Sequence, residues 1–459
     1  MTALELKNVT FTYESAGEPV LRNVNFHVEH GEVALLAGFS GAGKSTVLRI
    51  LSGIIPGTIP GTMTGDVLVD GESYTGKNIG AFCRKVGVIL QNADEQIIRR
   101  SVEDEIAFGC ENLAFPPEKI AEQVQETCNL MKLSPQWKPR KLSGGQKQRL
   151  LTACVLAMGQ KILIMDEPLA NLDREGAELV MELARKLAHE ENYAVLIVEH
   201  RLDVVLPYAD AVWNIIDGCI AQTRETPENA ILPDPCGPFL GEQDILQVQN
   251  LAFSVKRRAI LEDVTFSAKR GERLLLLGEN GCGKTTLLRC LARLNKPSGG
   301  SVQWDLQKKD WFRHMGVVYQ NPNYQLFMPT VEREIWFGCR SEERTEEVLE
   351  AFRLKEIAQR HPQSLSEGQK RRVSIAAVVA SSPEVLLLDE PTVGQDYRGL
   401  MELVDILNSW HEKNGTTLIT VTHDHRCADA LCDHALLLAD GKIQNEGGKE
   451  LTKIHFCSD

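Results

Sequence analysis

The sequence lacks any C-x-x-C pair, although it contains 12 cysteines among its 459 residues. Several cysteines, such as Cys154 and Cys290, lie within apolar segments instead. Paired spacing is what a disulfide framework or a zinc site would show, so both are disfavoured. We expect the cysteines to be small buried hydrophobic residues of a protein in a reducing compartment.

Long apolar runs and an excess of positive charge are missing as well. No apolar run approaches the ~18 residues of a membrane-spanning helix, and the N-terminal MTALELKNV lacks the basic-then-apolar order of a signal segment. Acidic residues outnumber basic residues 63 to 50, which disfavours non-specific binding of nucleic acid. Work at a membrane would therefore require a partner.

What the sequence does contain is an internal repeat. Between Gln91–Cys110 and Gln320–Cys339, ten of twenty positions are identical, all at the offset 320 − 91 = 229. Farther along, KLSGGQKQRL and SLSEGQKRRV, and ILIMDEP and VLLLDEP, repeat at one offset of 223. At roughly 150 residues per domain, the length allows two or three domains. We predict two tandem domains, residues 1–225 and 244–459, joined by a proline-rich linker over residues 226–243.

Each copy shows the order of a parallel α/β core. Short alternating strands come first, followed by an apolar run (VALLAG or LLLLG), a glycine-rich turn and a helical pattern. The later runs ILIMDEP, VLLLDEP, AVLIVEH and TLITVTH are short, apolar and followed by polar residues, which is typical of buried central strands.

Both copies match the phosphate-loop pattern G-x-x-x-x-G-K-[ST], directly after an apolar strand and before a helix. Glycines let backbone N–H groups converge on phosphate oxygens, the lysine reaches the β- and γ-phosphates, and the hydroxyl binds Mg²⁺. The predicted nucleotide-binding residues are Gly38, Phe39, Ser40, Gly41, Ala42, Gly43, Lys44, Ser45 and Thr46 in the first copy, and Gly278, Glu279, Asn280, Gly281, Cys282, Gly283, Lys284, Thr285 and Thr286 in the second.

Two acidic residues follow one apolar run in each copy. Asp166 and Glu167, and likewise Asp389 and Glu390, are placed at the carboxyl edge of a parallel sheet, where ligands bind. The aspartate can hold Mg²⁺ through water, and the glutamate can orient or deprotonate the water that attacks the γ-phosphate. A helix cap is the structural alternative for Asp-Glu-Pro, but the phosphate loop in each copy favours catalysis.

A second anion site is indicated in each copy. Ser143 in LSGGQ and Ser366 in LSEGQ precede a glycine and a helical pattern. They are expected to be N-caps with exposed N–H groups, which bind anions. Because each copy already has a phosphate loop, this second site needs a second phosphate.

Together these motifs resemble those of ATP-binding-cassette (ABC) ATPases and cover nearly the whole chain in two cassettes. The resemblance implies two tandem P-loop domains, each with a mainly parallel core sheet, an antiparallel β subdomain and a helical signature subdomain. It also implies ATP and Mg²⁺ as cofactors and two cassettes that pair head to tail. Lys44, Asp166, Glu167, Gln91 and His200 would then face Ser366 and Gly368, while Lys284, Asp389, Glu390, Gln320 and His423 would face Ser143 and Gly145.

The resemblance also assigns roles to single residues. Tyr13 matches the aromatic residue that stacks on adenine. Gln91 and Gln320 match the glutamines that sense Mg²⁺ and the attacking water. His200 and His423 match the histidines that contact the γ-phosphate. The implied catalytic residues are Glu167, Glu390, His200, His423, Gln91 and Gln320. The implied metal ligands are Ser45, Gln91, Asp166, Thr285, Gln320 and Asp389.

The second copy departs from the family pattern at two positions. Val255 stands at the position of Tyr13, so adenine stacking is expected to be weaker there unless Phe253 or another side chain substitutes. Glu367 stands at the position of Gly144, and a carboxylate near a closed phosphate site can be repulsive. Since both copies retain their lysine, glutamate and histidine, we expect two hydrolytic sites of unequal strength.

The repeated segment after the glutamine gives the most specific clue. Its wording, Q-N-x-x-x-Q-[IL]-[IF]-x-x-[ST]-V-x-x-E-I-x-F-G, is similar to ATPases of energy-coupling-factor importers, which take up vitamins and transition-metal ions. The implied partners are a transmembrane coupling protein and a small membrane substrate-binding protein, at the cytoplasmic face of a bacterial membrane. The implied partner-facing side chains are Ile97, Ile98, Leu326, Phe327 and Trp336; helical core packing is the alternative, above all for Trp336.

Two other functions remain open. Twin-cassette sugar importers also have membrane partners, but they usually carry one degenerate cassette, whereas both catalytic sets are intact here. A soluble twin-cassette ATPase that acts on ribosomes would resemble its relatives in having a long, charged helical linker, and the linker here is short and proline-rich. Excision-repair ATPases would need zinc-type cysteine pairs.

Overall fold

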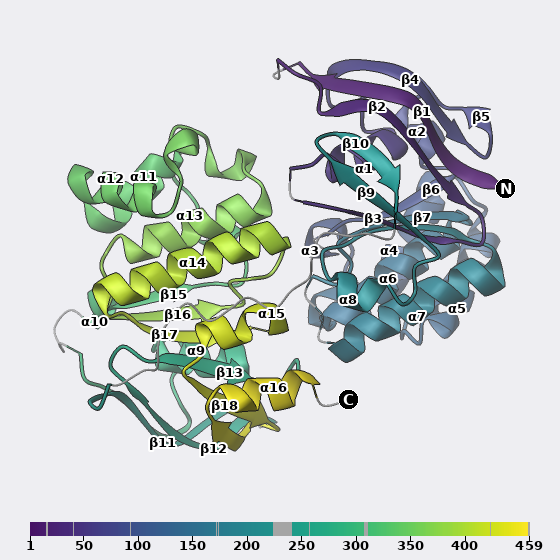
Figure 1. Cartoon of the computed structure of the whole chain (residues 1–459). Coiled ribbons are helices and arrows are strands. Elements are labelled where there is room, and N and C mark those ends of the chain that lie inside the picture. The colour runs from purple at the N-terminus through teal and green to yellow at the C-terminus, as the bar shows by residue number, and fades with distance from the viewer. Residues whose placement is uncertain are drawn as a thin grey trace. The chain divides into compact units, whose positions relative to one another are not determined.

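The computed structural model describes residues 1–14, 17–39, 41–91, 93–170, 172, 174–223, 241–256, 258–306, 311–422 and 424–457. The chain divides into two compact units, Met1–Asn229 and Ala230–Asp459 (Figure 1). Most of the predicted linker lies outside the described residues. Among the described residues, no helix combines the length and the hydropathy needed to cross a bilayer.

The first unit contains two sheets. An antiparallel sheet has the strand order β2-β1-β4-β5, and a larger sheet has the order β10-β9-β3-β8-β7-β6, in which all neighbours are parallel except β10 and β9. The strands are β1 (Thr2–Tyr13), β2 (Leu21–Glu29), β3 (Val33–Gly38), β4 (Gly61–Val69), β5 (Glu72–Ser73), β6 (Val86–Ile89), β7 (Ile162–Asp166), β8 (Ala194–Val198), β9 (Ala211–Ile216) and β10 (Cys219–Gln222).

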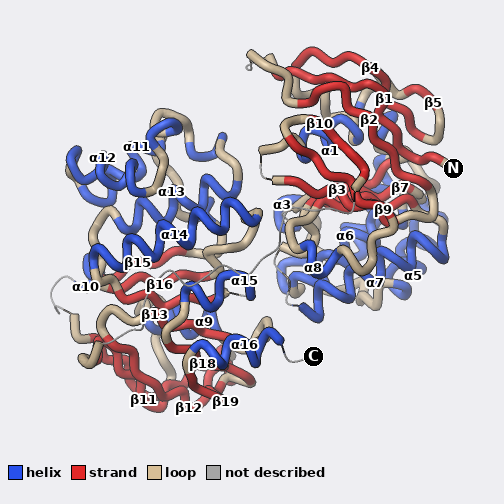
Figure 2. The backbone as a smooth tube through the Cα atoms, in the orientation of Figure 1, coloured by secondary structure: helices blue, strands red, loops and turns tan. Residues whose placement is uncertain are grey.

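The helices of the first unit cover the parallel sheet and form a separate helical region (Figure 2). They are α1 (Lys44–Leu51), α2 (Ile79–Phe82), α3 (Ala93–Gln96), α4 (Val102–Asn112), α5 (Pro117–Leu130), η1 (Pro139–Lys141), α6 (Gly144–Ala157), α7 (Arg174–Glu191) and α8 (Leu202–Val205).

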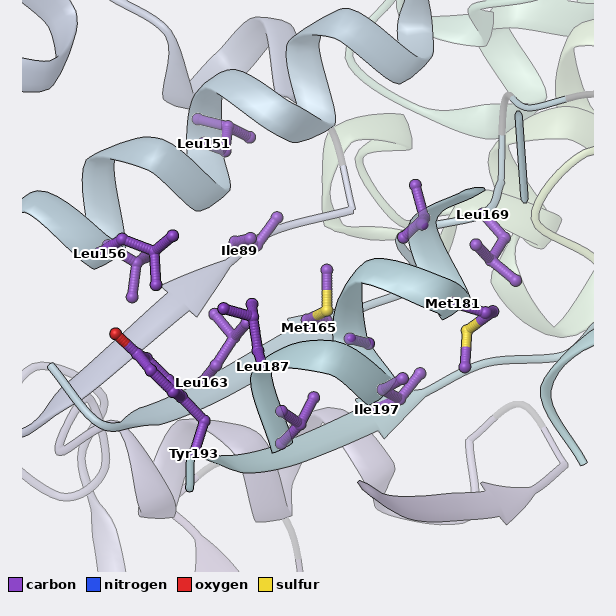
Figure 3. Close-up of a cluster of buried hydrophobic side chains, with 14 of the residues drawn as sticks. Ile89, Leu151, Leu156, Leu163, Met165, Leu169, Met181, Leu187, Tyr193 and Ile197 are labelled. Carbon is purple, nitrogen blue, oxygen red and sulfur yellow. The ribbon is translucent and has the colours of Figure 1, made fainter. Parts of the chain in front are cut away.

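The central strands are apolar throughout because both of their faces are buried. On β3, Leu35 packs into one hydrophobic cluster and Leu36 into the other, and β7 and β8 alternate in the same way. Figure 3 shows the first cluster, where Leu163 of β7 and Ile197 of β8 lie beneath side chains of α6 and α7 such as Leu151. Two-sided burial of this kind is what a parallel sheet requires.

The second unit repeats this plan with an antiparallel sheet of order β12-β11-β14 and a six-stranded sheet of order β15-β16-β17-β13-β18-β19. Its strands are β11 (Asp244–Val255), β12 (Arg258–Lys269), β13 (Arg273–Leu277), β14 (Gly299–Trp304), β15 (Met315–Val318), β16 (Val385–Asp389), β17 (Thr417–Val421), β18 (His434–Ala439) and β19 (Lys442–Gly447). In the larger sheet β19 runs antiparallel to β18, and the other described neighbours are parallel.

The helices of the second unit form a sheet-covering layer and a helical region of their own. They are α9 (Lys284–Leu291), α10 (Trp311–His314), η2 (Pro322–Tyr324), α11 (Val331–Cys339), α12 (Glu342–Ala351), η3 (Lys355–Ile357), η4 (Pro362–Ser364), α13 (Glu367–Val379), α14 (Tyr397–Asn414), α15 (His425–Ala428), η5 (Asp429–Leu431) and α16 (Lys449–Cys457).

The predicted fold class is confirmed in both units. Each has a mainly parallel core sheet, an antiparallel β subdomain and a helical subdomain that contains the helix after the signature serine, α6 or α13. The expectation for the cysteines holds in part. Cys290 is buried and Cys154 is half-buried, but Cys83 and Cys219 are exposed because they lie in a turn and on the edge strand β10.

Candidate active sites

The phosphate loop of the first unit joins β3 to α1. Gly38 and Gly43 adopt positive φ angles of 149° and 113°, and a Cβ atom at Gly38 would lie 2.6 Å from the Ile215 carbonyl oxygen. Only glycine tolerates both the backbone and the close approach. Lys44 is buried, and its Nζ donates to the carbonyl oxygens of Gly38 (2.7 Å) and Phe39 (2.9 Å). The loop thus closes around the ammonium group.

The second unit builds the same loop between β13 and α9. Gly278 and Gly283 have φ angles of 140° and 115°, and Lys284 Nζ donates to the carbonyl oxygens of Gly278 (2.7 Å) and Glu279 (2.8 Å). The near-identical distances show that the two predicted phosphate loops share one conformation. Of the predicted loop residues, Ser40 lies outside the described residues.

Three predicted catalytic side chains converge in the first unit. Gln91, Glu167 and His200 follow the neighbouring strands β6, β7 and β8. Gln91 Nε2 donates to Glu167 Oε2 at 2.6 Å, and His200 Nε2 lies 3.3 Å from Glu167 Oε1. Beside them, burial and then the charge of Glu167 raise the pKa of Asp166 to about 7. The carboxyl edge of the sheet therefore gathers this predicted set.

Both predicted catalytic glutamates have a left-handed backbone. The φ angle is 47° at Glu167 and 50° at Glu390, and their N–H groups donate to the carbonyl oxygens of Val198 (2.8 Å) and Val421 (2.9 Å). A non-glycine residue in this region is unfavourable by about 1–3 kcal/mol and concentrates at functional sites. The same unusual geometry in both copies supports a functional role for the two glutamates.

The second unit presents its acidic pair in a different setting. Thr285 Oγ1 donates to Asp389 Oδ1 at 3.1 Å, so these two predicted metal ligands are adjacent. Burial raises the pKa of Asp389 above its usual value. The hydrogen bond from Thr285 and the charges of Arg289, Lys284 and Arg371 act in the opposite direction but are outweighed. The predicted His423 lies outside the described residues.

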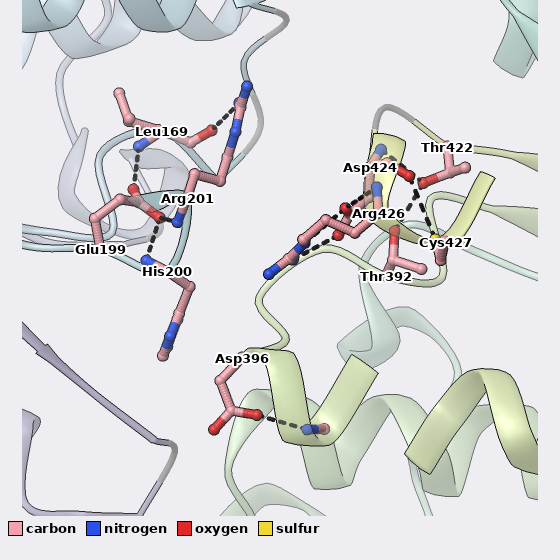
Figure 4. A network of polar contacts seen from close by, with 11 residues as sticks. Leu169, Glu199, His200, Arg201, Thr392, Asp396, Thr422, Asp424, Arg426 and Cys427 are labelled. Carbon is pink, nitrogen blue, oxygen red and sulfur yellow. Dashed lines mark hydrogen bonds and ion pairs between the residues drawn. The ribbon is translucent and has the colours of Figure 1, made fainter. Parts of the chain in front are cut away.

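A buried glutamate that sequence reasoning missed directly precedes His200 (Figure 4). Glu199 is only 2% exposed, and its carboxylate accepts hydrogen bonds from the N–H groups of Leu169 (3.0 Å), His200 (2.8 Å) and Arg201 (3.2 Å). Arg201 Nη1 donates to the carbonyl oxygens of Leu169 (3.3 Å) and Leu172 (2.7 Å). These bonds tie the segment after β7 to the segment that carries the histidine.

The second unit has a neutral counterpart at the same register. Thr422 replaces Glu199, and its hydroxyl lies 2.8 Å from that of Thr392. Asp424 replaces Arg201 and binds the Arg426 side chain at 2.6 Å (Figure 4). The offset of 223 between the copies was the signal that could have revealed the Glu199 difference.

The signature serines are exposed N-caps, as predicted from their sequence. Ser143 Oγ accepts from the Gln146 N–H at the start of α6, and Ser366 Oγ accepts from the Gln369 N–H at the start of α13, both at 3.3 Å. Each is part of a complete capping box. Because the serine oxygen accepts from the backbone, its O–H remains a donor that can reach an external phosphate.

Glu367 is paired within its own helix. Lys370 Nζ lies 2.8 Å from Glu367 Oε1, whereas the equivalent Lys147 of the first unit pairs with Asp94 at 2.7 Å. The lysine charge offsets part of the repulsion expected between Glu367 and a phosphate. Gly368, the neighbouring predicted phosphate contact, follows Glu367 in α13, and Gly145 has the corresponding place in α6.

The predicted adenine-stacking positions lie at equivalent strand ends. The Tyr13 hydroxyl lies 2.9 Å from Thr46 Oγ1, which links the end of β1 to α1. Val255 ends β11 and is exposed, and Phe253 packs against the core of its unit. The difference at these strand ends stays as the sequence predicted, and the stacking roles remain predictions.

Comparison with known proteins decides the family. The family model described as ABC transporter matches residues 21–170 and 261–393, which is more than half of the chain. A protein of Bacillus subtilis (strain 168), provisionally named an HMP/thiamine import ATP-binding protein, is 32% identical over an alignment that covers 97% of this chain and 91% of that protein. The chain belongs to the ABC transporter family. It is an ATPase with two ATP-binding cassettes, which confirms the resemblance seen in the motifs.

Other comparisons agree with this membership. An ABC transporter ATP-binding protein of Methanosarcina acetivorans, also provisionally named, is 31% identical and is covered to 86%, with 98% of this chain aligned. In the crystal structure of the complex of archaeal ribosomal stalk protein and archaeal ribosome recycling factor, one chain matches this ABC ATPase with a TM-score of 0.66 and 22% identity, covering 98% of this chain and 92% of that chain. At that identity the likeness shows the shared fold alone.

The predicted partner-facing residues of this ABC ATPase are exposed to different extents. Ile98 and Phe327 are exposed, and Ile97 and Trp336 are half-buried. The prediction for Leu326 is wrong, because this side chain is 5% exposed and belongs to the core of the helical region. Leu326 turns inward after η2 and packs with residues of α11 and α13, while its neighbour Phe327 turns outward.

Proposed function

We propose that this ABC ATPase is the ATP-hydrolysing, energy-coupling subunit of an energy-coupling-factor type importer for vitamins or transition-metal ions. It would work at the cytoplasmic face of a bacterial membrane, with a transmembrane coupling protein and a small membrane substrate-binding protein. The observation that carries this proposal is a rigid, exposed surface after the predicted glutamine of each cassette. The import role in the name of the Bacillus subtilis relative supports the same direction.

The surface of the second cassette, which we call the aromatic surface, consists of Tyr324, Phe327, Trp336 and Phe337. Tyr324 is 78% exposed and Phe327 is 66% exposed, and the rings of Phe327 and Phe337 meet edge to face at 5.4 Å. Clustered large apolar side chains at a surface mark interaction sites. An apolar helix face of a membrane protein is a partner of matching chemistry.

A buried carboxylate holds the chain at the aromatic surface, and another holds the equivalent segment of the first cassette, residues 98–100. Glu334 accepts from the N–H groups of Phe327 (3.0 Å) and Met328 (2.7 Å), and Glu105 of the first cassette accepts from Ile98 (3.0 Å) and Arg99 (2.5 Å). These bonds hold the backbone at the residues whose side chains are exposed, Phe327 in the second cassette and Ile98 in the first. A docking surface that is already ordered loses less entropy when it binds.

The two surfaces differ in charge. The first cassette exposes Arg99 and Arg100 where the second has Met328 and Pro329. The Arg99 guanidinium lies 4.3 Å from the centre of the Phe108 ring. One partner that presents two non-identical segments, one of them acidic, would fit this pair of surfaces.

The catalytic residues suit an ATP site with Mg²⁺. The predicted ligands supply hydroxyl, amide and carboxylate oxygens, which are the donors that Mg²⁺ prefers. Bound there, Mg²⁺ would neutralise charge on the β- and γ-phosphates. Lys44 and Lys284 would bind phosphate oxygens, and Glu167 and Glu390 would orient the attacking water. In the proposed head-to-tail pair, Ser366 and Ser143 would donate to the γ-phosphate of the opposite cassette.

A tagged pull-down from detergent-solubilised native membranes tests the proposal. We expect a transmembrane coupling protein with one or more small membrane proteins, whose identities would point to the substrate. Recovery of sugar-importer permeases would instead favour the alternative function, the ATPase of a twin-cassette sugar importer. Recovery of ribosomes without membrane proteins would overturn the importer role and leave the ATPase assignment in place.

A matched pair of variants locates the docking site. Phe327→Asp places a charge on the aromatic surface and should lower capture of the coupling protein by about tenfold, since it removes the apolar anchor of the surface. Leu294→Asp alters an exposed leucine outside the surface and should leave capture unchanged. Equal capture by both variants would contradict docking at the aromatic surface.

A further inference from the structure

One arginine of the second cassette joins two of its predicted catalytic segments, those of Gln320 and Glu390. Arg371 lies in α13 and is only 4% exposed. Its Nη1 donates to the Glu390 carbonyl oxygen and its Nη2 donates to the Gln320 carbonyl oxygen, each at 2.8 Å. A single planar guanidinium therefore spans two backbone segments.

These two segments follow neighbouring parallel strands. Gln320 comes shortly after β15 and Glu390 comes directly after β16, and the two strands pair from Met315–Val385 to Val318–Leu388. The spacing between the two carbonyl groups fixes where the attached side chains can reach. Arginine is suited to this task because its rigid fork presents two donors in fixed geometry.

The surroundings explain why a charged group is buried here. The carboxylates of Glu367, Glu390 and Asp389 lie close enough to favour its positive charge. Its Nε has no hydrogen-bond partner within the described part of the chain, so the two terminal nitrogens carry the connection. The arginine thus contacts the edge of the sheet through its fork alone.

Among the described residues of the first cassette, no arginine makes this connection. Gln148 stands at the same register, since 371 − 148 = 223, and it is buried. Its Oε1 has no hydrogen-bond partner among the described residues. In that cassette, the Gln91 and Glu167 side chains bond directly, and Glu199 braces the neighbouring segments.

We propose that Arg371 is a positioning residue for ATP hydrolysis in the second cassette, where it fixes the spacing of Gln320 and Glu390 so that both act on one attacking water. The proposal rests on the roles proposed above for these two residues. The arginine acts through the two backbone carbonyl groups that it holds.

The test uses the full chain in a Glu167→Gln background, so that turnover reports the second cassette. Arg371→Lys keeps a positive charge but cannot bond both carbonyl groups as a fork. We expect about a fivefold or greater loss of kcat with the KM for ATP within about twofold, the pattern of a lost transition-state interaction. Arg371→Gln, which copies the first cassette, should lose about tenfold or more.

Two controls separate positioning from a general structural effect. Arg372→Lys changes the next residue of the same helix, whose side chain binds Glu402 at 2.8 Å, and it should leave kcat unchanged. In a Glu390→Gln background, where turnover reports the first cassette, Arg371→Lys should change kcat by less than about twofold. Disruption of α13 as a whole would instead impair both cassettes.

Wild-type kcat in Arg371→Lys would overturn the proposal, as would equal losses in the two backgrounds. If Arg371→Gln fails to fold, Arg371→Lys still decides, because it keeps the buried charge. The outcome is independent of the importer role. A chain that captures no membrane protein but shows this kcat loss would refute the importer and support the positioning role.

Discussion

The two predicted catalytic glutamates share a backbone conformation while their neighbours differ. The Glu167 side chain accepts a hydrogen bond from Gln91, and the Glu390 carbonyl oxygen accepts one from Arg371. Both glutamates hold their left-handed φ through an N–H bond to the neighbouring strand, and Arg371 adds a contact at the Glu390 carbonyl oxygen. This is a physical reason to expect that the two predicted sites turn over ATP at different rates.

Glu167→Gln and Glu390→Gln should each remove one site, with losses of about 100-fold or more at that site, because a positioned base contributes on this scale. The remaining sites should differ. Turnover left in Glu167→Gln comes from the cassette with Val255. Its KM for ATP should be about fivefold higher or more than that of the turnover left in Glu390→Gln, since valine has no ring that could stack on adenine. Steady-state ATP hydrolysis measures both values.

Val255→Tyr in the Glu167→Gln background is the matched control, and it should lower that KM towards the value of the other cassette. Identical losses and identical KM values in Glu167→Gln and Glu390→Gln would refute unequal sites. A Val255→Tyr variant that leaves the KM unchanged would refute adenine stacking as the cause of the difference.

Residues inside a contiguous motif could be predicted from the sequence, and residues that act across the chain could not. Lys44 and Glu167 stand in patterns with fixed spacing and lie where they were predicted. Glu199 and Arg371 contact segments that lie far away in the sequence. In the sequence alone, Arg371 resembles an ordinary basic residue on the surface of a helix. Leu326 and Phe327 are neighbours of similar character, so periodicity alone did not decide which one turns inward.

At the scale of elements, the hairpin of β18 and β19 contains a charge pairing that depends on pH. His434 Nδ1 lies 3.2 Å from Glu272 Oε1, and its Nε2 lies 3.0 Å from Glu446 Oε1. The hydrogen bond with Glu272 raises the pKa of His434 above its usual 6.5, because its effect is larger than the opposing effect of burial. The protonated histidine thus links the end of the sheet to the segment before β13.

This pairing should make the second unit lose stability as pH rises. A histidine whose pKa is raised in the folded state contributes stability that is complete below pH 6.5 and disappears as pH passes through the raised pKa. Between about pH 6 and 8 we expect a decrease of about 1 kcal/mol or less, given partial exposure. Thermal unfolding of wild type and His434→Gln across this range measures it.

His434→Gln should flatten this part of the pH profile. His189→Gln serves as a control in the first unit, because His189 contacts Asp210 at a more exposed site. An unchanged slope in His434→Gln would show that the hairpin does not depend on the charged histidine.

Elements were easier to predict than their contacts. The strands β3, β7 and β8 are short apolar runs because both faces are buried, and this leaves a clear mark in the sequence. The short helix α3 and the 3-10 turn η2 occupy equivalent positions but differ in type, and the repeated wording around them did not reveal this.

At the scale of the whole molecule, each unit has hydrophobic cores of its own. Leu35 lies in a core of the first unit and Leu275 in a core of the second, and both are fully buried. The predicted domain boundaries at residues 225 and 244 remain predictions, since most of the intervening segment lies outside the described residues.

Separate cores predict separate unfolding transitions. Leu35→Ala should destabilise the first unit by about 2–5 kcal/mol, because it leaves a cavity between the sheet and its helices. For a unit of this size, that corresponds to a fall of roughly 5–15 °C in one of two calorimetric transitions. Leu275→Ala should shift the other transition. A single transition that moves equally in both variants would contradict independent cores.

The Arg371 fork also has a consequence for the history of the repeat. Two similar halves in one chain invite recombination, which would copy one signature helix into the place of the other. A helix with glutamine at the Gln148 position, moved into the second half, would leave the carbonyl groups of Gln320 and Glu390 without their donor. Sequence exchange between the halves is therefore penalised at this helix, and the duplicated halves can diverge but cannot readily be made identical again.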